Sequence, residues 1–249
     1  ENVPGILTMR KGEALDEIIE SFEKIGYHVN TPFRLNAEEY GVPQKRKRLI
    51  LIGSRITDPK IVFDQIRKKA TFEESFTWRE QAVKIWKILG VVEEEKMPWR
   101  TLRDGLSGLV DEEKECMKFP SWGKYLKHIP PGGYWKDLPM HVRKKAMGQA
   151  ADTDDPKRKG KQGGRTGFFR RLSWDLPSPT LVTSPSQMGT CLCHPDEDRP
   201  LTVREYARLQ GFPDSWEFVG STSQKYRMIG EAVPVCLAKV IADAIKSFL

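Results

Sequence analysis

Four consecutive cations stand directly against a short apolar run in the segment GVPQKRKRLILIG, residues 41–53. The run RLILIG has the length and composition of a buried strand, which places these charges at a sheet. Alternate side chains of an extended chain share a face, so Arg46 and Arg48 are predicted to point one way and Lys45 and Lys47 the other. Paired guanidiniums suit a planar phosphate or carbonyl partner. The plain alternative is a solvated edge that deters strand-to-strand aggregation.

The segments around this run predict the edge of an α/β sheet. Apolar residues at helical spacing predict a helix over residues 13–25, followed by a strand within 27–37. Thr-x-x-Glu capping boxes predict helices over 77–90 and after Thr202, and Pro234 opens a closing helix. The sequence between these elements is rich in proline, glycine and tryptophan, which indicates a loop-rich domain.

Charge and cysteine content narrow the class of protein. The formal net charge of +7 favours an acidic partner, of which nucleic acid is the commonest. Four scattered cysteines form no disulfide framework, so a reducing cytoplasm is expected, without a membrane span or a signal peptide. Cys191-x-Cys193-His194 has no second ligand cluster in the sequence, so no metal is expected there.

Four segments, taken in order, resemble the C-terminal part of the DNA cytosine-C5 methyltransferases. They are Glu1-Asn2-Val3, Gln44 to Arg48, Arg204 to Asp214 and Gly230 to Pro234. The resemblance implies the last part of a doubly wound S-adenosylmethionine-dependent methyltransferase sheet, with a loop-rich mixed α/β target-recognition domain. The expected division is residues 1–56 for the catalytic part, 57–225 for recognition and 226–249 for a helix that packs back on the catalytic part.

The resemblance also implies roles for the matching residues. In the family, a cysteine thiolate attacks C6 of a cytosine that has been flipped out of the duplex. Glu1 matches the carboxylate that grips N3 and the exocyclic amine, and Arg48 matches the arginine at O2. Arg46 matches a support to the catalytic loop or to phosphate. The cofactor S-adenosyl-L-methionine is expected beside Gly230, Glu231 and Ala232.

Two departures from the family pattern shape the expectation. None of the four cysteines follows a proline, and the Phe-x-Gly-x-Gly cofactor loop is missing, whereas the family carries both before the ENV segment. The chain is therefore expected to need a second chain with the N-terminal methyltransferase half, which implies a broad apolar face for that partner. Glu231 stands where the family usually has asparagine. Its carboxylate would either repel the carboxylate of the cofactor or meet a cation on the partner.

The expected DNA contacts come from the basic run and the recognition region. Residues 157–171 hold seven cations and no acid, which predicts a DNA-contacting loop, with a solvated loop as the alternative. The pair Thr180-Leu181 resembles a conserved pair of family recognition domains, and an ordinary strand fragment is the alternative. The predicted DNA-binding residues are Lys45, Arg165, Arg170, Arg171, Thr180 and Thr183.

Three functions remain open on the sequence alone. The first is half of a DNA cytosine-C5 methyltransferase of a restriction–modification system, acting on duplex DNA in a prokaryotic cytoplasm. The second is an inactive DNA-recognition module, which would have no need to retain both the ENV segment and the QKRKR segment. The third is an RNA cytosine methyltransferase of the same fold, against which the long basic recognition region argues.

Overall fold

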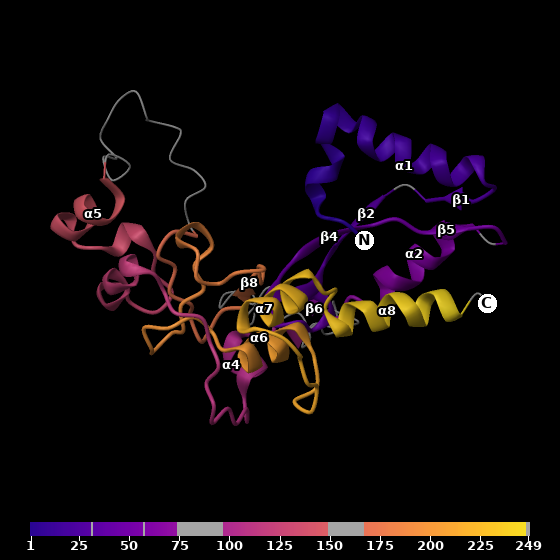
Figure 1. Cartoon of the computed structure of the whole chain (residues 1–249). Helices are drawn as coiled ribbons and strands as arrows, with labels where there is room; N and C mark the ends of the chain where they lie inside the picture. Colours follow the sequence, from indigo (N-terminus) through magenta and orange to yellow (C-terminus); the bar gives the residue numbers. More distant parts are fainter. Residues whose placement is uncertain (31, 57, 74–96, 149–166, 248–249) are drawn as a thin grey trace, which may run out of the picture. The chain divides into compact units, whose positions relative to one another are not determined.

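The computed structural model describes residues 1–30, 32–56, 58–73, 97–148 and 167–247 (Figure 1). The chain divides into two compact units: unit 1 comprises Glu1–Arg100 with Val233–Leu249, and unit 2 comprises Thr101–Ala232. The helix predicted over 77–90 lies outside the described residues. Among the described helices, none combines the length and the apolar character that crossing a bilayer requires.

Unit 1 contains short strand pairs, both antiparallel and parallel, with helices beside them. In chain order its elements are η1 (Pro4–Leu7), η2 (Met9–Gly12), α1 (Glu13–Lys24), β1 (His28–Val29), β2 (Phe33–Asn36), η3 (Ala37–Tyr40), β3 (Gln44–Lys45), β4 (Lys47–Ile50), β5 (Gly53–Ser54), α2 (Pro59–Lys68), β6 (Phe72–Glu73), β7 (Met97–Pro98) and α8 (Val235–Lys246). β2 pairs with β4 antiparallel, with Leu35 opposite Arg48, and β1 pairs with β5 antiparallel along the same two segments, whereas β6 and β7 pair in parallel. The predicted helix at 13–25 and both predicted strands are therefore present.

The core of unit 1 decides which segments belong to it. Phe33 and Ile50 of the paired strands pack in one cluster with Val62 and Ile66 of α2 and with Leu237 of α8. Because α2 and α8 share this core, unit 1 extends past residue 56, to Arg100, and begins again at Val233. The compact units are thus divided after residues 100 and 232, whereas the sequence predicted divisions after residues 56 and 225.

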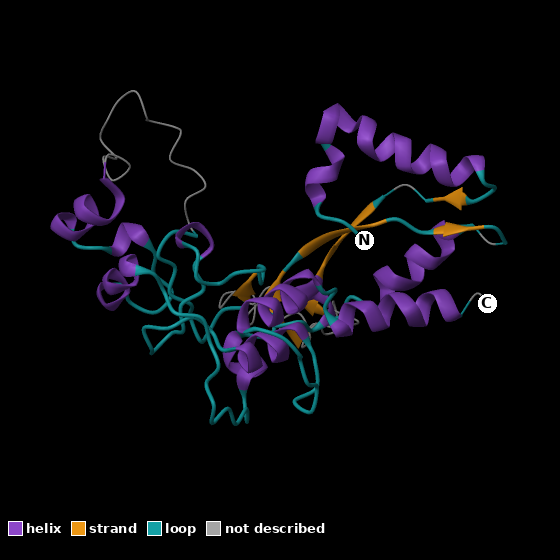
Figure 2. Ribbon diagram, in the orientation of Figure 1, coloured by secondary structure: helices purple, strands orange, loops and turns teal. Residues whose placement is uncertain are grey.

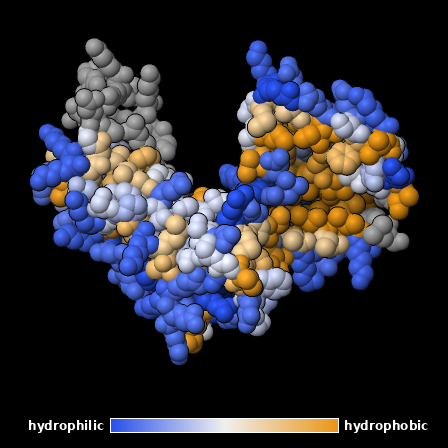
Figure 3. All heavy atoms as spheres, viewed as in Figure 1, coloured by the Kyte–Doolittle hydropathy of each residue, from blue (hydrophilic) through white to orange (hydrophobic). Residues whose placement is uncertain are grey.

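Helix α1 has the apolar stripe that its sequence predicts, but much of the stripe is uncovered. Ala14 is buried, whereas Ile18, Phe22 and Ile25 are exposed. The chain leaves the helix at Gly26, whose φ of +87° suits the residue that lacks a β-carbon. In Figure 3, apolar atoms gather on the visible face of unit 1. Exposed apolar groups of this kind mark surfaces that bind a partner.

Unit 2 is rich in loops, as the sequence predicts (Figure 2). Its elements are α4 (Leu102–Leu106), η4 (Ser121–His128), η5 (Trp135–Asp137), α5 (Met140–Met147), β8 (Ser178–Pro179), η8 (Met188–Thr190), α6 (Val203–Gln210) and α7 (Thr222–Glu231). α6 begins at the predicted capping box, in which the Thr202 hydroxyl accepts from the backbone of Glu205 and the Glu205 carboxylate accepts from the backbone of Thr202.

Two separate apolar cores hold unit 2 together. The larger core joins α4, α6 and α7 with Leu181 and Leu192, and the rings of Tyr206 and Tyr226 meet edge to face at 5.0 Å within it. The smaller core gathers η4, η5 and α5 around Trp135 and Phe169. Each core therefore supports its own set of loops.

The end of helix α7 lies very close to the backbone of residues 182–183. A β-carbon added to Gly230 would lie 2.6 Å from the carbonyl oxygen of Val182 and 2.9 Å from the backbone nitrogen of Thr183. These are backbone atoms, which cannot rotate away as a side chain can.

We predict that Gly230→Ala lowers the free energy of unfolding by about 2 kcal/mol, because overpacking forces the backbone to shift. Urea denaturation of the whole chain, followed by circular dichroism, measures this change. Gly5→Ala is the matched control, because an added β-carbon at Gly5 meets nothing within 4 Å. Equal unfolding midpoints for the two variants would contradict the packing argument.

Candidate active site

The two arginines of the basic run lie in the interior of unit 1. Lys45 and Lys47 are exposed, whereas Gln44, Arg46 and Arg48 are buried. The predicted alternation along the strand is confirmed. A wholly solvated edge, the plain alternative, is wrong for the arginine face.

The segment Glu1–Val3 lies alongside β4 and brings a carboxylate to that face. The backbone nitrogen of Asn2 donates to the carbonyl of Leu49 at 2.9 Å, and the nitrogen of Leu49 donates to the carbonyl of Asn2 at 2.8 Å. Side chains alternate along both segments, so Glu1 and Arg48 are diagonal neighbours on the face opposite to Asn2 and Leu49. The Glu1 carboxylate forms an ion pair with Nε of Arg48. The two residues whose joint action the sequence predicts are in direct contact.

The surroundings of the pair differ for its two members. The side chain of Arg48 is 10% exposed and that of Glu1 is 26% exposed. Burial lowers the pKa of the Arg48 guanidinium, and the neighbouring Glu1 opposes that change. An arginine stays charged in proteins, so the buried cation needs these acceptors, and its Nη1 also donates to the carbonyl of Lys47 at 2.9 Å. The pair can present an acceptor and a donor to the edge of one planar ring.

Arg46 is held within the protein behind the ion pair. Its backbone nitrogen donates to the Glu38 carboxylate at 3.1 Å, and its Nη1 donates to the Gln44 side chain at 3.5 Å. Burial raises the pKa of Glu38. Support to the catalytic loop and support to phosphate both remain predictions for Arg46, whose side chain is 1% exposed.

Glu38 is a site residue that the sequence analysis missed. It lies in η3, in the turn that returns the chain from β2 towards β3 and β4. The available signal was an acid directly across a short turn from a run of cations. Lys45 points away from this interior, and its Nζ lies 5.0 Å from the ring centroid of Trp99.

The geometry agrees with comparisons to known proteins. The family model described as C-5 cytosine-specific DNA methylase matches residues 1–247. The chain belongs to this family.

The chain is also similar to curated relatives. The chain is 37% identical over 249 residues to Type II methyltransferase M.Sau96I of Staphylococcus aureus, covering all of this chain and 50% of that protein. It is 41% identical over 247 residues to Type II methyltransferase M.PspPI of Psychrobacter sp., covering 98% of this chain and 52% of that one. The chain thus spans about half the length of these relatives.

The crystal structure of the S. pombe Dnmt2 methyltransferase matches with a TM-score of 0.54 and 16% identity, over 99% of this chain and 65% of that one. This match confirms the predicted fold class, an α/β methyltransferase fold. At 16% identity, the match supports the fold and nothing further.

The residues of this family member that were expected at the cofactor lie at the end of α7. Gly230 is buried, and its α-carbon faces the chain's own backbone at Val182 and Thr183. The Glu231 carboxylate is exposed and pairs with Nε of Arg227 at 2.9 Å, one helical turn earlier. The carbonyl of Ala232 accepts from the side chain of Gln210. Each of the three residues has a contact within unit 2.

These three residues do not form a pocket for S-adenosyl-L-methionine by themselves. The requirement for glycine at position 230 follows from packing against residues 182–183, and the carboxylate of Glu231 has a cation on its own helix. Of the two alternatives for Glu231, a cation does meet it, but that cation belongs to α7.

The predicted recognition threonines flank a buried leucine in unit 2. Leu181 lies in the larger core, and the backbone nitrogen of Val182 donates to the Tyr206 hydroxyl at 3.3 Å. Thr180 is half-buried and Thr183 is exposed. The segment is therefore anchored on α6, with Thr183 open to solvent.

Arg171, one of the predicted DNA-binding residues, lies in the interior of unit 2. Arg171 is 5% exposed. Its Nε donates to the carbonyl of Ile129 at 2.8 Å and its Nη2 to that of Leu126 at 2.8 Å, and it pairs with Asp198. The guanidinium joins loops of unit 2 and has no free edge for a guanine. Burial also lowers the pKa of Arg170, which is half-buried, and Arg165 lies outside the described residues.

The cysteine–histidine segment is occupied by contacts within unit 2. Cys193 donates from its sulfur to the carbonyl of Glu197 at 3.4 Å, and burial raises the pKa of this thiol to about 12. Nδ1 of His194 accepts from the backbone nitrogens of Asp196 and Glu197, each at 3.2 Å. Within the described ranges, no group of three or more possible ligands is placed to hold a metal ion.

We predict that Arg171→Gln lowers the free energy of unfolding by about 3 kcal/mol, because several buried carbonyls lose a charged donor. Urea denaturation measures the change. Arg103→Gln is the matched control, because the ion pair of Arg103 with Asp175 is exposed and worth less than about 1 kcal/mol. A variant Arg171→Gln that folds as stably as the parent, but binds duplex DNA more weakly, would support the predicted DNA-binding role.

Proposed function

We propose that this chain is the base-gripping and target-recognising part of a DNA cytosine-C5 methyltransferase. The observation that carries the proposal is the ion pair between Glu1 and Arg48 on one face of the sheet. Both residues match the family positions that hold the target cytosine, and both lie in unit 1. The setting is a restriction–modification system, as with the Type II relatives, in the cytoplasm of a prokaryote.

The pair would act by balancing charge on the target ring. Cytosine C5 becomes nucleophilic when a thiolate forms a bond to C6, which moves an electron pair of the ring towards N3 and O2. Glu1 would accept a hydrogen bond from the exocyclic amine with one oxygen and, when its carboxyl group carries a proton, would donate that proton to N3 as negative charge develops there. Arg48 would donate to O2 and stabilise the negative charge that develops there. Buried donors act strongly in such a site because little water competes with them.

The ion pair also prepares the site for the base. Without substrate, each charged group satisfies the other, so neither is left buried and unpaired. A flipped cytosine would take over contacts that Glu1 and Arg48 now make with each other. Glu1, the more exposed member, would move more easily than Arg48, which β4 and the carbonyl of Lys47 hold in place.

The sequence of this chain lacks two motifs that the family reaction uses. The Pro-Cys nucleophile and the Phe-x-Gly-x-Gly cofactor loop are absent from its sequence, and its relatives are about twice as long. We propose that an N-terminal methyltransferase half, supplied as a second chain, completes the site. S-adenosyl-L-methionine would supply the methyl group for C5 and would be held by that half. The exposed stripe of α1 gives the half an apolar surface to bind.

We predict that Arg48→Ala lowers methyl transfer by about 10²- to 10³-fold, the usual cost of removing one donor to a developing oxyanion. The assay mixes this chain with a chain that carries the Pro-Cys loop and measures labelled methyl transfer to duplex DNA. Arg48→Lys should also lose activity, because an ammonium cannot present the same planar donors.

Arg34→Ala is the matched control. Arg34 lies on the neighbouring strand β2, but its side chain is exposed. Full activity of Arg48→Ala would refute the base-gripping role. Methyl transfer to folded RNA, but not to duplex DNA, would favour the RNA methyltransferase.

A further inference from the structure

One end of unit 2 forms a basic surface, which we call the basic lobe and define as residues 119–148. It comprises η4, η5 and α5 around the smaller core. Its sequence contains a single acid, Asp137. Its six strong cations are Lys124, Lys127, Lys136, Arg143, Lys144 and Lys145.

The charges of the basic lobe are not neutralised from within. The Asp137 carboxylate accepts a hydrogen bond from the backbone nitrogen of Tyr134 at 2.8 Å, as part of the capping box of η5. Arg143 is the one structural cation of the six, since it donates to the carbonyl of Leu138 at 3.1 Å and lies over the ring of Trp135. The five lysines are exposed, and none makes an ion pair with another described residue.

Several cations elsewhere in unit 2 form ion pairs with acids. Arg199 lies between Glu197 and Glu205, with nitrogen–oxygen distances of 3.0 Å and 2.8 Å. Lys225 pairs with Glu115 at 2.8 Å, and Lys114 pairs with Glu197 at 3.2 Å. These acids thus have cation partners of their own. Asp196 and Asp198 line a pocket beside Lys127. Of these two, Asp196 accepts from the ring nitrogen of Trp174, and Asp198 pairs with Arg171.

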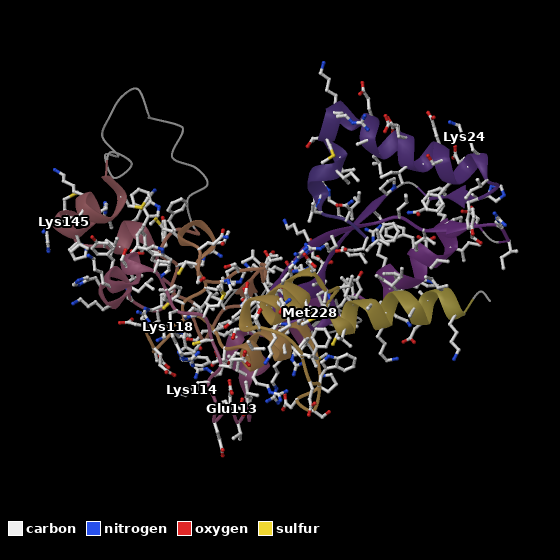
Figure 4. The ribbon with its side chains drawn as sticks, viewed as in Figure 1. Lys24, Glu113, Lys114, Lys118, Lys145 and Met228 are labelled. Carbon is white, nitrogen blue, oxygen red and sulfur yellow. The ribbon has the colours of Figure 1, made fainter. Side chains whose placement is uncertain are left out.

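Along the sequence of unit 2, the acids are concentrated in two stretches outside the basic lobe. Residues 101–117 hold five acids and two strong cations, and residues 172–232 hold eight acids and five. Figure 4 shows Lys145 projecting outward from α5, far along unit 2 from Glu113 and Lys114. The exposed cations of the basic lobe repel one another. Binding of a polyanion to this surface would relieve that repulsion.

The lysines stand on a firm base. Leu126 of η4 and Val142 of α5 are buried in the smaller core with Trp135, so the elements that carry the cations are packed together. Nζ of Lys124 lies 5.3 Å from the ring centroid of Tyr125, and Nζ of Lys136 lies 5.8 Å from that of Trp135. Binding would therefore cost little reorganisation of the backbone.

We propose that the basic lobe binds the phosphate backbone of duplex DNA and positions the chain on it without reading bases. Lysines act as point charges rather than as planar forks, so they suit phosphates more than guanine edges. The inference rests on the proposed function, which makes duplex DNA the substrate. It assigns positioning to the described residues 119–148, whereas the sequence predicted DNA contacts from residues 157–171.

The test replaces four exposed lysines together, as Lys124→Gln, Lys127→Gln, Lys144→Gln and Lys145→Gln. Binding of the whole chain to a duplex is measured over a range of salt concentrations. The slope of log affinity against log salt should become shallower by about 0.9 for each phosphate that the variant no longer neutralises, or about 2 to 4 in total. The same four positions changed to arginine should keep the parental slope.

The matched control carries the same change of charge on unit 1, at the exposed residues Lys24, Lys60, Lys239 and Lys246. An unchanged slope in the basic-lobe variant, or an equal loss in the control, would overturn the inference. Tighter binding of the parent to folded RNA than to duplex DNA at equal salt would overturn it as well.

The inference and the proposed function fail in different ways. If the basic-lobe variant keeps the parental slope while Arg48→Ala abolishes methyl transfer, the basic lobe has another role and the enzyme assignment stands. If the slope becomes shallower while Arg48→Ala stays fully active, the basic lobe binds DNA and the base-gripping assignment is wrong.

Discussion

The two backbone hydrogen bonds between Asn2 and Leu49 are the constraint on which the candidate site depends. They align a short N-terminal segment with β4, a strand more than forty residues later in the chain. Once that register exists, the alternation of side chains carries Glu1 and Arg48 to one face and leaves only a short diagonal for their charges to span. A slip of this segment by one residue along β4 would turn the Glu1 side chain to the opposite face, away from Arg48.

The rest of unit 1 holds this register in place. β2 pairs with β4 on a defined alignment, and the buried faces of α2 and α8 pack against these strands. The carboxylate of the buried Glu38 accepts a hydrogen bond from the backbone nitrogen of Arg46. This bond fixes the chain just before Arg48. The geometry of the Glu1–Arg48 ion pair thus depends on segments from both ends of the chain.

Unit 2 uses its charged residues in two ways. Arg171 and Arg199 are drawn inward, where carbonyls and carboxylates satisfy them and join loops that regular structure does not hold. The lysines of the basic lobe are exposed, and none forms an ion pair with another residue that the structure describes. An inward arginine contributes to the stability of the unit, whereas an outward lysine is available to a polyanion. Both kinds of residue contribute equally to the net charge, which cannot distinguish them.

The sequence by itself determined the local features and the family. The apolar spacing of α1, the capping box of α6 and the alternation along Gln44–Arg48 are periodic or short-range, and the family match confirms the motifs that led to it. Only the tertiary structure decided that α2 joins the core of unit 1, that Gly230 faces the backbone of Val182, and that Arg171 lies inside. These outcomes depend on which distant segments meet. A cation in a sequence has the same charge whether a carbonyl or solvent will surround it, and only packing chooses between them.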